Sequence, residues 1–173
     1  MDLNVLRQLP VLNDFSNGEL IDLFANASEQ QFSPGTFLCK EGEQDGNLYF
    51  LVSGEIEVLK KGTDGDTHVL ASLTNGALLG ELSWIMGTPC TASLKARKET
   101  SVILLTGNIL TQQLQERSPG AFKLSIALLR LLAGRLMRMN DQFLESQAKP
   151  NGNGNKKSEI ERLRERILHD WSF

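Results

Sequence analysis

Residues 76–96, GALLGELSWIMGTPCTASLKA, decide the fold of this chain. Gly80 permits a close backbone approach after a short strand, and Glu81 begins a helical turn that Gly87 ends. The free amides at the start of that turn and the helix dipole suit an anion. Thr91 adds a hydroxyl nearby, and Glu81 can accept a hydrogen bond from a sugar hydroxyl. From spacing alone, the stretch indicates an anion site without identifying its ligand.

Short apolar runs alternate with glycine-bearing turns from Gln30 to Thr106. An interval of about ten residues between turns is typical of an antiparallel barrel or sandwich. The runs of strand length are LYFLVS (48–53), EIEVLK (55–60), THVLASL (67–73), ASLKA (92–96) and SVILLT (101–106). We therefore predict an α+β fold built on an antiparallel β-roll of the jelly-roll or double-stranded β-helix kind, over residues 29–106.

Helical patterns flank the predicted β-roll. Residues 1–28 carry leucine and phenylalanine at helical spacings, with Ser16 placed to cap a helix, and predict two or three short helices. Residues 107–148 predict a short helix, a break and then a long helix. At the break, Ser118 can cap the long helix and Pro119 suits its first turn.

The predicted long helix is apolar on two sides, so both sides must be covered. A small β-roll is insufficient for both, and we expect a homodimer through this helix. Gly134 permits close approach of a partner, while Lys123, Arg130 and Arg138 mark the side expected to face solvent. The residues expected in the dimer contact are Leu128, Leu132, Leu136, Met139 and Phe143.

Residues 1–148 thus form one predicted domain, and two segments follow it. Residues 149–157 are rich in glycine, asparagine and lysine and predict a flexible linker. Within residues 158–173, Ser158 and Glu161 form a capping box ahead of an amphipathic pattern, which predicts a short tail helix. This helix either folds back on its own domain or docks on a partner; the pattern fits both.

The composition argues against several classes of partner. A net charge of −3 and a pI of about 5.5 give no field for binding nucleic acid. The residues after Ala148 also leave no room for a helix-turn-helix, so we expect no DNA binding. No stretch approaches the roughly 18 apolar residues needed to span a bilayer, and no export signal begins the chain. We expect a cytoplasmic protein with no membrane contact.

The few cysteines and histidines argue against catalysis. Cys39 and Cys90 form no CxxC pair, which argues against a disulfide framework, a zinc site or any other metal site. His68 and His169 have no nearby ligand or triad partners in sequence. We therefore predict a chain that is not an enzyme and carries no cofactor.

The order of turns and strands, with LYFLVSGEIEV and GELSWIMGTPCTASLKA, resembles the cyclic nucleotide-binding domain family over about Leu6 to Leu144. This family includes catabolite-activator-type regulators, kinase regulatory subunits and gated channels. The resemblance implies a phosphate-binding cassette in which backbone amides and one arginine hold the cyclic phosphate. The matching residues here are Gly80, Glu81, Leu82, Ser83, Cys90, Thr91 and Ala92. By the same resemblance, Glu81 holds the ribose 2′-hydroxyl, and Met139 and Asn140 lie near the base.

Two departures from the family pattern stand out. The family's Gly-Asp appears reversed as Asp45-Gly46, which we expect to alter only the turn. Cys90 stands where the family has the cassette arginine, and a thiol cannot pair a phosphate bidentately. A lost charge-assisted hydrogen bond of about 1.5–3 kcal/mol weakens binding about 10- to 100-fold. Lys95 and Arg97 are the nearby cations in sequence that could replace this arginine.

Two functions fit these observations. The first is a degenerate module that regulates through protein contacts, with cyclic nucleotide binding weakened or lost, and Cys90 favours it. The second is a sensor of cyclic AMP, cyclic GMP or a related nucleotide that relays binding through the long helix. Gly80, Glu81 and Thr91 favour the sensor. For Cys90 itself, a buried inert thiol is expected over a redox-active one.

Overall fold

The computed structural model describes residues 2–63 and 65–148, so the predicted linker 149–157 and tail helix 158–173 lie outside the described residues. The chain divides into two compact units, one ending at Leu128 and the other beginning at Leu129. This boundary falls within the range for which the sequence predicts one domain. The β-roll and the helices before it belong to the first unit.

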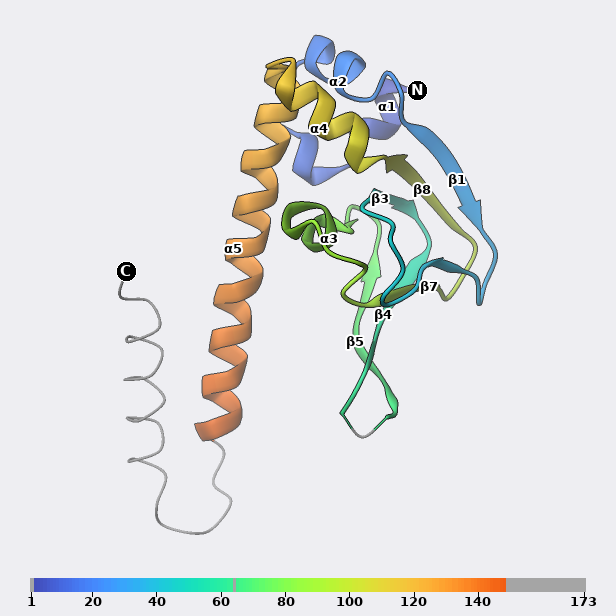
Figure 1. The fold of residues 1–173 in the computed structure, drawn as a ribbon, viewed down its shortest axis with the longest axis vertical. Helices are drawn as coiled ribbons and strands as arrows, with labels where there is room; N and C mark the ends of the chain where they lie inside the picture. Colours follow the sequence, from blue (N-terminus) through green and yellow to red (C-terminus); the bar gives the residue numbers. More distant parts are fainter. Residues whose placement is uncertain (1, 64, 149–173) are drawn as a thin grey trace. The chain divides into compact units, whose positions relative to one another are not determined.

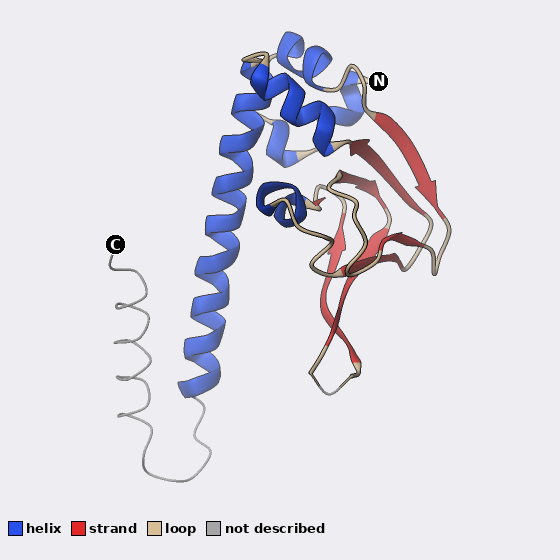
Figure 2. Ribbon diagram, viewed as in Figure 1, coloured by secondary structure: helices blue, strands red, loops and turns tan. Residues whose placement is uncertain are grey.

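Eight strands among the described residues pair into two antiparallel four-stranded sheets (Figures 1 and 2). The first sheet has the order β1-β8-β3-β6 and the second β2-β7-β4-β5. The strands are β1 (Ser28–Phe32), β2 (Phe37–Cys39), β3 (Leu48–Ser53), β4 (Glu55–Lys61), β5 (Thr67–Thr74), β6 (Leu78–Leu79), β7 (Ser93–Ala96) and β8 (Thr100–Leu105). The predicted antiparallel β-roll is confirmed.

The five strands predicted from sequence appear as β3, β4, β5, β7 and β8, each within one residue of its predicted limits. Three strands went unpredicted. β1 has the sequence SEQQF, which lacks an apolar alternation because it is an edge strand paired only with β8. β2 and β6 are three and two residues long, too short to show a period. These strands form because longer neighbours supply the hydrogen-bonding edge.

Three short helices precede the β-roll: α1 (Leu3–Leu6), the 3-10 helix η1 (Pro10–Leu12) and α2 (Asn17–Leu23). Ser16 caps α2 as predicted. Its Oγ accepts a hydrogen bond from the Glu19 amide at 3.2 Å, and the Glu19 carboxylate accepts one from the Ser16 amide at 2.7 Å. The ring of Phe24 meets that of Phe50 edge-on at 5.1 Å, which joins the end of α2 to strand β3.

The later helices are α3 (Glu81–Met86), α4 (Gly107–Gln115) and α5 (Pro119–Ala148). The predicted break before the long helix is confirmed, because α5 begins at Pro119 and the Ser118 Oγ accepts from the Ala121 amide at 3.4 Å. None of the described helices combines the length and apolar character needed to cross a bilayer.

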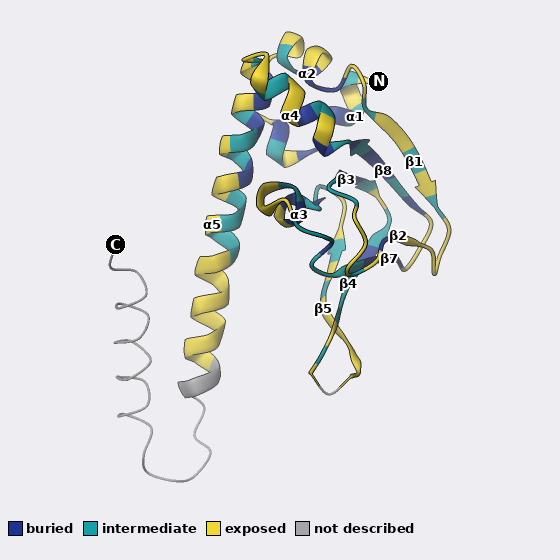
Figure 3. Ribbon diagram, in the orientation of Figure 1, coloured by how far each residue is buried: buried dark blue, intermediate teal, exposed yellow. Residues whose placement is uncertain are grey.

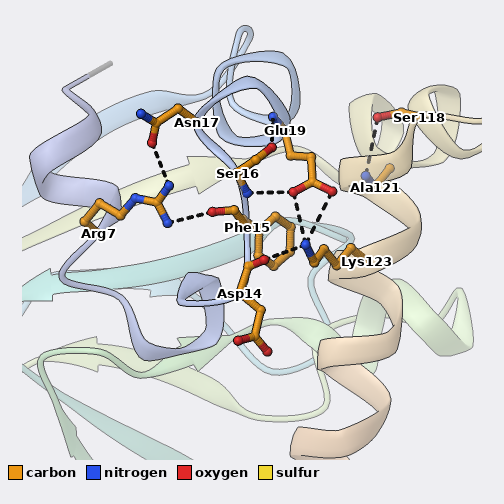
Figure 4. A network of polar contacts seen from close by, with 9 residues as sticks. All are labelled: Arg7, Asp14, Phe15, Ser16, Asn17, Glu19, Ser118, Ala121 and Lys123. Atoms are coloured by element: carbon orange, nitrogen blue, oxygen red, sulfur yellow. Dashed lines mark hydrogen bonds and ion pairs between the residues drawn. The ribbon is translucent and has the colours of Figure 1, made fainter.

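Lys123 anchors the first turns of α5 to the helices that precede the β-roll (Figure 4). Its ammonium lies 3.1 Å from the Glu19 carboxylate, donates to the Asp14 carbonyl and sits 5.2 Å from the centre of the Phe15 ring. Lys123 is therefore only partly exposed, with 37% of its side chain accessible, instead of facing solvent freely. Arg130 and Arg138, predicted on the same side, are exposed.

Anchoring α5 in this way determines which of its faces is buried (Figure 3). Ala121, Leu124 and Leu128 are fully buried in the first unit. Leu128 was predicted in the dimer contact, and this prediction is wrong because its side chain is already covered by its own chain. Leu132 is half-buried, while Leu136, Met139 and Phe143 are exposed.

The carboxylate of Glu55, at the start of β4, contacts three donor side chains. These contacts make the stability of the fold depend on pH. Lys98 Nζ lies 2.9 Å from its Oε2, and Ser72 Oγ and Arg97 Nη1 donate to its Oε1 at 3.1 and 3.0 Å. Lys98 first, and then Ser72, lower the pKa of Glu55 from 4.5 to about 2. A lowered carboxyl pKa stabilises the fold above the unfolded-state value and loses this contribution as the pH falls.

We predict that the Glu55 contribution is complete above about pH 4.5 and is lost as the pH falls toward about 2. Glu55→Gln should remove that part of the profile, measured as the urea midpoint at successive pH values. Lys98→Met should instead move the loss to higher pH, because it removes the largest cause of the shift. An unchanged profile for both variants would show that these donors do not stabilise the folded carboxylate.

Candidate ligand-binding site

Gly80 sets the geometry of the segment that resembles a phosphate-binding cassette. It precedes α3 with a φ of +86°, a left-handed conformation that favours glycine. A Cβ at this position would collide with the carbonyl oxygen of Asn47. The predicted helical turn from Glu81 to Met86 is confirmed, and Gly87 ends it in a second left-handed conformation.

Two of the side chains that follow Gly80 are buried. Glu81 is 2% exposed and Ser83 is 5% exposed, whereas Leu82 points outward at 40%. Trp84 fixes α3 to the start of α4, since its Nε1 donates to the Gly107 carbonyl at 3.2 Å. The residues predicted to donate amides and to hold a ribose therefore lie together on one short, firmly packed helix.

Cys90 is held against a second loop by its own backbone. Its N–H donates to the Glu43 carbonyl at 2.9 Å, and its carbonyl accepts from the Gly42 N–H at 2.8 Å. Its side chain is 5% exposed. The Cys90 Sγ, the Cys39 Sγ and a carboxylate oxygen of Asp45 all lie within 4.8 Å of one another. Where the family has a guanidinium, this chain thus has two buried thiols and a carboxylate.

Burial controls the chemistry of the two thiols. It is the largest cause that raises the pKa of Cys90, and the charges of Asp45 and Glu43 raise it further. Burial, followed by the interaction with Cys90, raises the pKa of Cys39 strongly. Both groups are protonated at neutral pH, which agrees with the expected inert character of Cys90.

Asp45 does more than shape the turn, contrary to the prediction from its reversed order with Gly46. Its Oδ1 accepts from the side-chain amide of Asn47 at 2.6 Å, and its Oδ2 accepts from the Tyr49 hydroxyl at 2.9 Å. Burial and the neighbouring Asp45 charge raise the pKa of Tyr49, so the phenol remains a donor. The sequence shows the motif Asp45-Gly46-Asn47 but not that its carboxylate turns toward Cys90.

Lys60 is the cation that lies at the cassette, and sequence reasoning missed it. Its ammonium donates to the Thr91 carbonyl at 2.5 Å and pairs with the Glu41 carboxylate at 2.6 Å. It reaches Thr91 because β4 pairs with β7, which begins two residues later. Thr91 and Ala92 are half-buried in this loop.

The two cations considered from sequence have other partners. Lys95 Nζ lies 5.5 Å from the centre of the Phe37 ring. Arg97 is 3.0 Å from Glu55 and 3.8 Å from Glu57. Neither replaces the missing arginine in this structure.

Met139 and Asn140, expected near the base, are exposed on the part of α5 that belongs to the second unit, and their role stays a prediction.

A cleft of about 430 Å³ opens beside the hairpin of β4 and β5. It is lined by Glu41, Leu59, Lys61, Thr67 and Ser93. The Oγ of Ser93 accepts from the Glu41 amide at 2.9 Å, and the Glu41 carboxylate accepts from the Lys61 amide at 3.0 Å. Its lining groups are therefore largely occupied with one another.

Comparison with known proteins agrees with this fold. A sequence model described as "Cyclic nucleotide-binding domain" matches residues 29–117. A cAMP-dependent protein kinase regulatory subunit from Yarrowia lipolytica is 34% identical over 100 residues, 58% of this chain, and the match spans only 26% of that subunit. The chain therefore corresponds to about a quarter of that relative.

Two solved structures resemble the chain closely in fold. A cyclic nucleotide-binding domain from Methylobacillus flagellatus has a TM-score of 0.76 and 28% identity, covering 87% of this chain and 86% of that one. The regulatory subunit of a cAMP-independent protein kinase A from Trypanosoma brucei has a TM-score of 0.66 and 21% identity, covering 85% and 50%. The second comparison supports the fold alone.

Gly80→Ala should destabilise the fold more than Gly87→Ala. Both glycines have positive φ, but only a Cβ at Gly80 meets another atom, the Asn47 carbonyl oxygen. Strain alone should cost Gly87→Ala about 1–2 kcal/mol, and the added collision should bring Gly80→Ala above about 3 kcal/mol. Urea unfolding followed by circular dichroism measures both. Equal losses of unfolding free energy in the two variants would mean that the loop around Asn47 moves aside at no cost in stability.

Proposed function

The chain belongs to the cyclic nucleotide-binding domain family, and on that basis we propose that it is a non-enzymatic regulatory module in which cyclic nucleotide binding is weakened or lost. It acts instead through contacts with proteins. Its free thiols suit a cytoplasmic location. The observation that carries the proposal is the environment of Cys90.

A cyclic nucleotide presents one negative charge to the cassette, which therefore needs a cation. The structure has a neutral thiol at Cys90, with the Asp45 carboxylate oxygen within 4.8 Å of its sulfur. A like charge disfavours an anion, and the missing arginine removes a contact of about 1.5–3 kcal/mol. Together these effects weaken binding by more than the roughly 10- to 100-fold that the arginine alone accounts for.

The names of similar proteins associate this fold with kinase regulatory subunits. A regulatory subunit that shares this fold is described as part of a cAMP-independent kinase. The fold is thus compatible with regulation that does not require that ligand. The Yarrowia lipolytica relative is the regulatory subunit of a cAMP-dependent kinase, which favours a protein partner for this module and leaves the loss of nucleotide binding to rest on Cys90.

A working sensor is the second candidate, and Lys60 is the observation that favours it. Its ammonium lies at the Thr91 carbonyl, in the same loop as Cys90. A phosphate in the cassette would have to draw Lys60 away from Glu41, which it contacts at 2.6 Å. Breaking this pair reduces the gain from the new contact, so the sensor is the less favoured function.

Calorimetric titration of the full chain with cyclic AMP, cyclic GMP and cyclic dinucleotides tests the proposal. We predict dissociation constants of about 1 mM or weaker for the wild type. Cys90→Arg should tighten binding at least tenfold, and Cys90→Arg with Asp45→Asn should tighten it further, because Asp45 no longer competes for the guanidinium. Cys90→Ser, which adds no charge, is the matched control and should gain nothing.

Micromolar binding by the wild type that Glu81→Ala abolishes would overturn the proposal and establish the sensor. In that case Lys60→Met should weaken binding while an exposed control, Lys61→Met, should not. Failure of both arginine variants to gain affinity would mean that the cassette has lost more than its cation.

We also propose that α5 forms a parallel homodimer, with a register that differs from the one expected from sequence. Residues that alternate three and four positions apart form one exposed stripe. They are Phe122, Ile126, Leu129, Ala133, Leu136, Asn140 and Phe143. This is the a/d pattern of a two-stranded coiled coil, in which a single buried asparagine specifies register. Leu136 and Phe143 remain from the expected set, while Leu128, Leu132 and Met139 drop out.

Leu129→Glu and Leu136→Glu should convert the dimer to a monomer, because each places a carboxylate in the stripe. Arg138→Glu changes an exposed residue outside the stripe and should leave the dimer intact. Sedimentation equilibrium at several concentrations distinguishes these outcomes. A wild type that stays monomeric at about 100 μM, a concentration at which even weak specific dimers assemble, would exclude the coiled coil.

A further inference from the structure

Two cysteine thiols and one carboxylate, all able to ligate zinc, meet between strand β2 and the loops that precede β3 and β7. Cys39 ends β2, Asp45 lies in the loop before β3, and Cys90 lies in the loop before β7. Their ligand atoms are all within 4.8 Å of one another. Both thiols are nearly inaccessible, at 6% and 5% exposed. We propose that Cys39, Asp45 and Cys90 bind a thiophilic divalent metal ion, and that this ion is zinc.

The spacing suits a metal better than a disulfide. A tetrahedral zinc ion with bonds of about 2.3 Å to sulfur holds two sulfurs about 3.8 Å apart. Ligand atoms within 4.8 Å of one another therefore need shifts of only about 1 Å to share one ion. A disulfide requires about 2.05 Å between the sulfurs and would involve only the two cysteines. Two sulfurs and one oxygen also select zinc over magnesium or calcium, which prefer oxygen alone.

Two of the three ligands, Asp45 and Cys90, are already oriented by neighbouring groups. Asn47 and Tyr49 donate to the two oxygens of Asp45 at 2.6 and 2.9 Å. The Cys90 backbone is bonded on both sides, to Gly42 and to Glu43. Carboxylate ligands held by such donors are typical of metal sites, where the supporting groups affect affinity about 10- to 100-fold. Three protein ligands leave the fourth position of a tetrahedral ion for water or another donor.

Binding releases the proton of each thiol to solvent as its sulfur bonds to the metal, and no oxidation takes place. Two thiolates and one carboxylate around a divalent ion leave a net charge of −1. The metal therefore does not replace the positive charge of the missing arginine. This inference does not rest on the proposed function, since the module can bind zinc whether or not it binds a cyclic nucleotide.

The sequence predicts no metal site here because its two cysteines are far apart and form no CxxC pair. A CxxC pair identifies only metal ligands that lie close together in the sequence, on one local turn. In this fold the ligands come from three separate segments, which the pairing of β2 with β7 brings together. The proposal revises the expectation of no metal.

Cobalt(II) titration of the full chain, reduced with a phosphine and freed of metal by a chelator, tests the site. We expect one equivalent to produce a sulfur-to-cobalt charge-transfer band and the visible bands of a tetrahedral ion, and zinc to remove them by displacement. Cys39→Ser and Cys90→Ser should each remove the charge-transfer band or reduce it by half. Asp45→Asn should weaken binding, whereas Glu43→Gln, a carboxylate in the same loop, should not.

Tyr49→Phe provides a test that keeps all three ligands. It removes the donor to Asp45 and should weaken cobalt binding about 10- to 100-fold. Zinc should raise the thermal midpoint of the wild type and of Glu43→Gln, but not that of Cys90→Ser. Circular dichroism of each metal-free variant identifies any that fails to fold. If the ligand variants do not fold, the difference in cobalt affinity between Tyr49→Phe and Glu43→Gln tests the site.

Absence of a thiolate band in the wild type would overturn the proposal. So would a band that persists at full intensity in Cys90→Ser, or one that His68→Ala abolishes while Cys39→Ser does not. Titrating cyclic AMP into the metal-free and zinc-loaded protein separates the two proposals. Nucleotide binding would contradict the proposed function without affecting the proposed metal site. Failure to bind metal would overturn the metal site without affecting the proposed function.

Discussion

Two backbone hydrogen bonds at Cys90 determine how the cassette is built. Its N–H bonds to the Glu43 carbonyl and its carbonyl to the Gly42 N–H, so the loop before β7 lies against the loop before β3. Gly80 approaches the end of the same loop, where only glycine clears the Asn47 carbonyl. The cassette therefore takes its shape from residues 42–47, and the side chains of those residues define its electrostatics.

Those side chains make the region suited to a cation. Asp45 is turned toward Cys90 by Tyr49 and Asn47, and Lys60, the cation at the Thr91 carbonyl, is paired with Glu41. An anion would meet a carboxylate here, whereas a metal ion would meet a carboxylate and two thiols. The weakened nucleotide binding and the metal site that we propose thus follow from one arrangement of charges.

The long helix shows how a single contact selects one face among several. Its sequence is apolar on two sides and does not distinguish the buried side from the exposed one. Lys123 pairs with Glu19 and directs Leu124 and Leu128 into the first unit. The stripe through Leu129 and Leu136 is left exposed as a consequence. A dimer register deduced from the apolar pattern alone therefore mixed residues from two faces.

The sequence by itself determined what depends on neighbours a few positions away. The cap at Ser16, the turn at Gly80, the limits of α3 and the strands with clear alternation all follow from local conformational preferences. Matching the order of these elements also identified the family. Only the tertiary structure decided which distant side chains meet: Cys39 with Asp45 and Cys90, Lys60 with Thr91, and Lys123 with Glu19. These contacts depend on strand register and helix rotation, which are set by the packing of the whole unit and leave no periodic signal in the sequence.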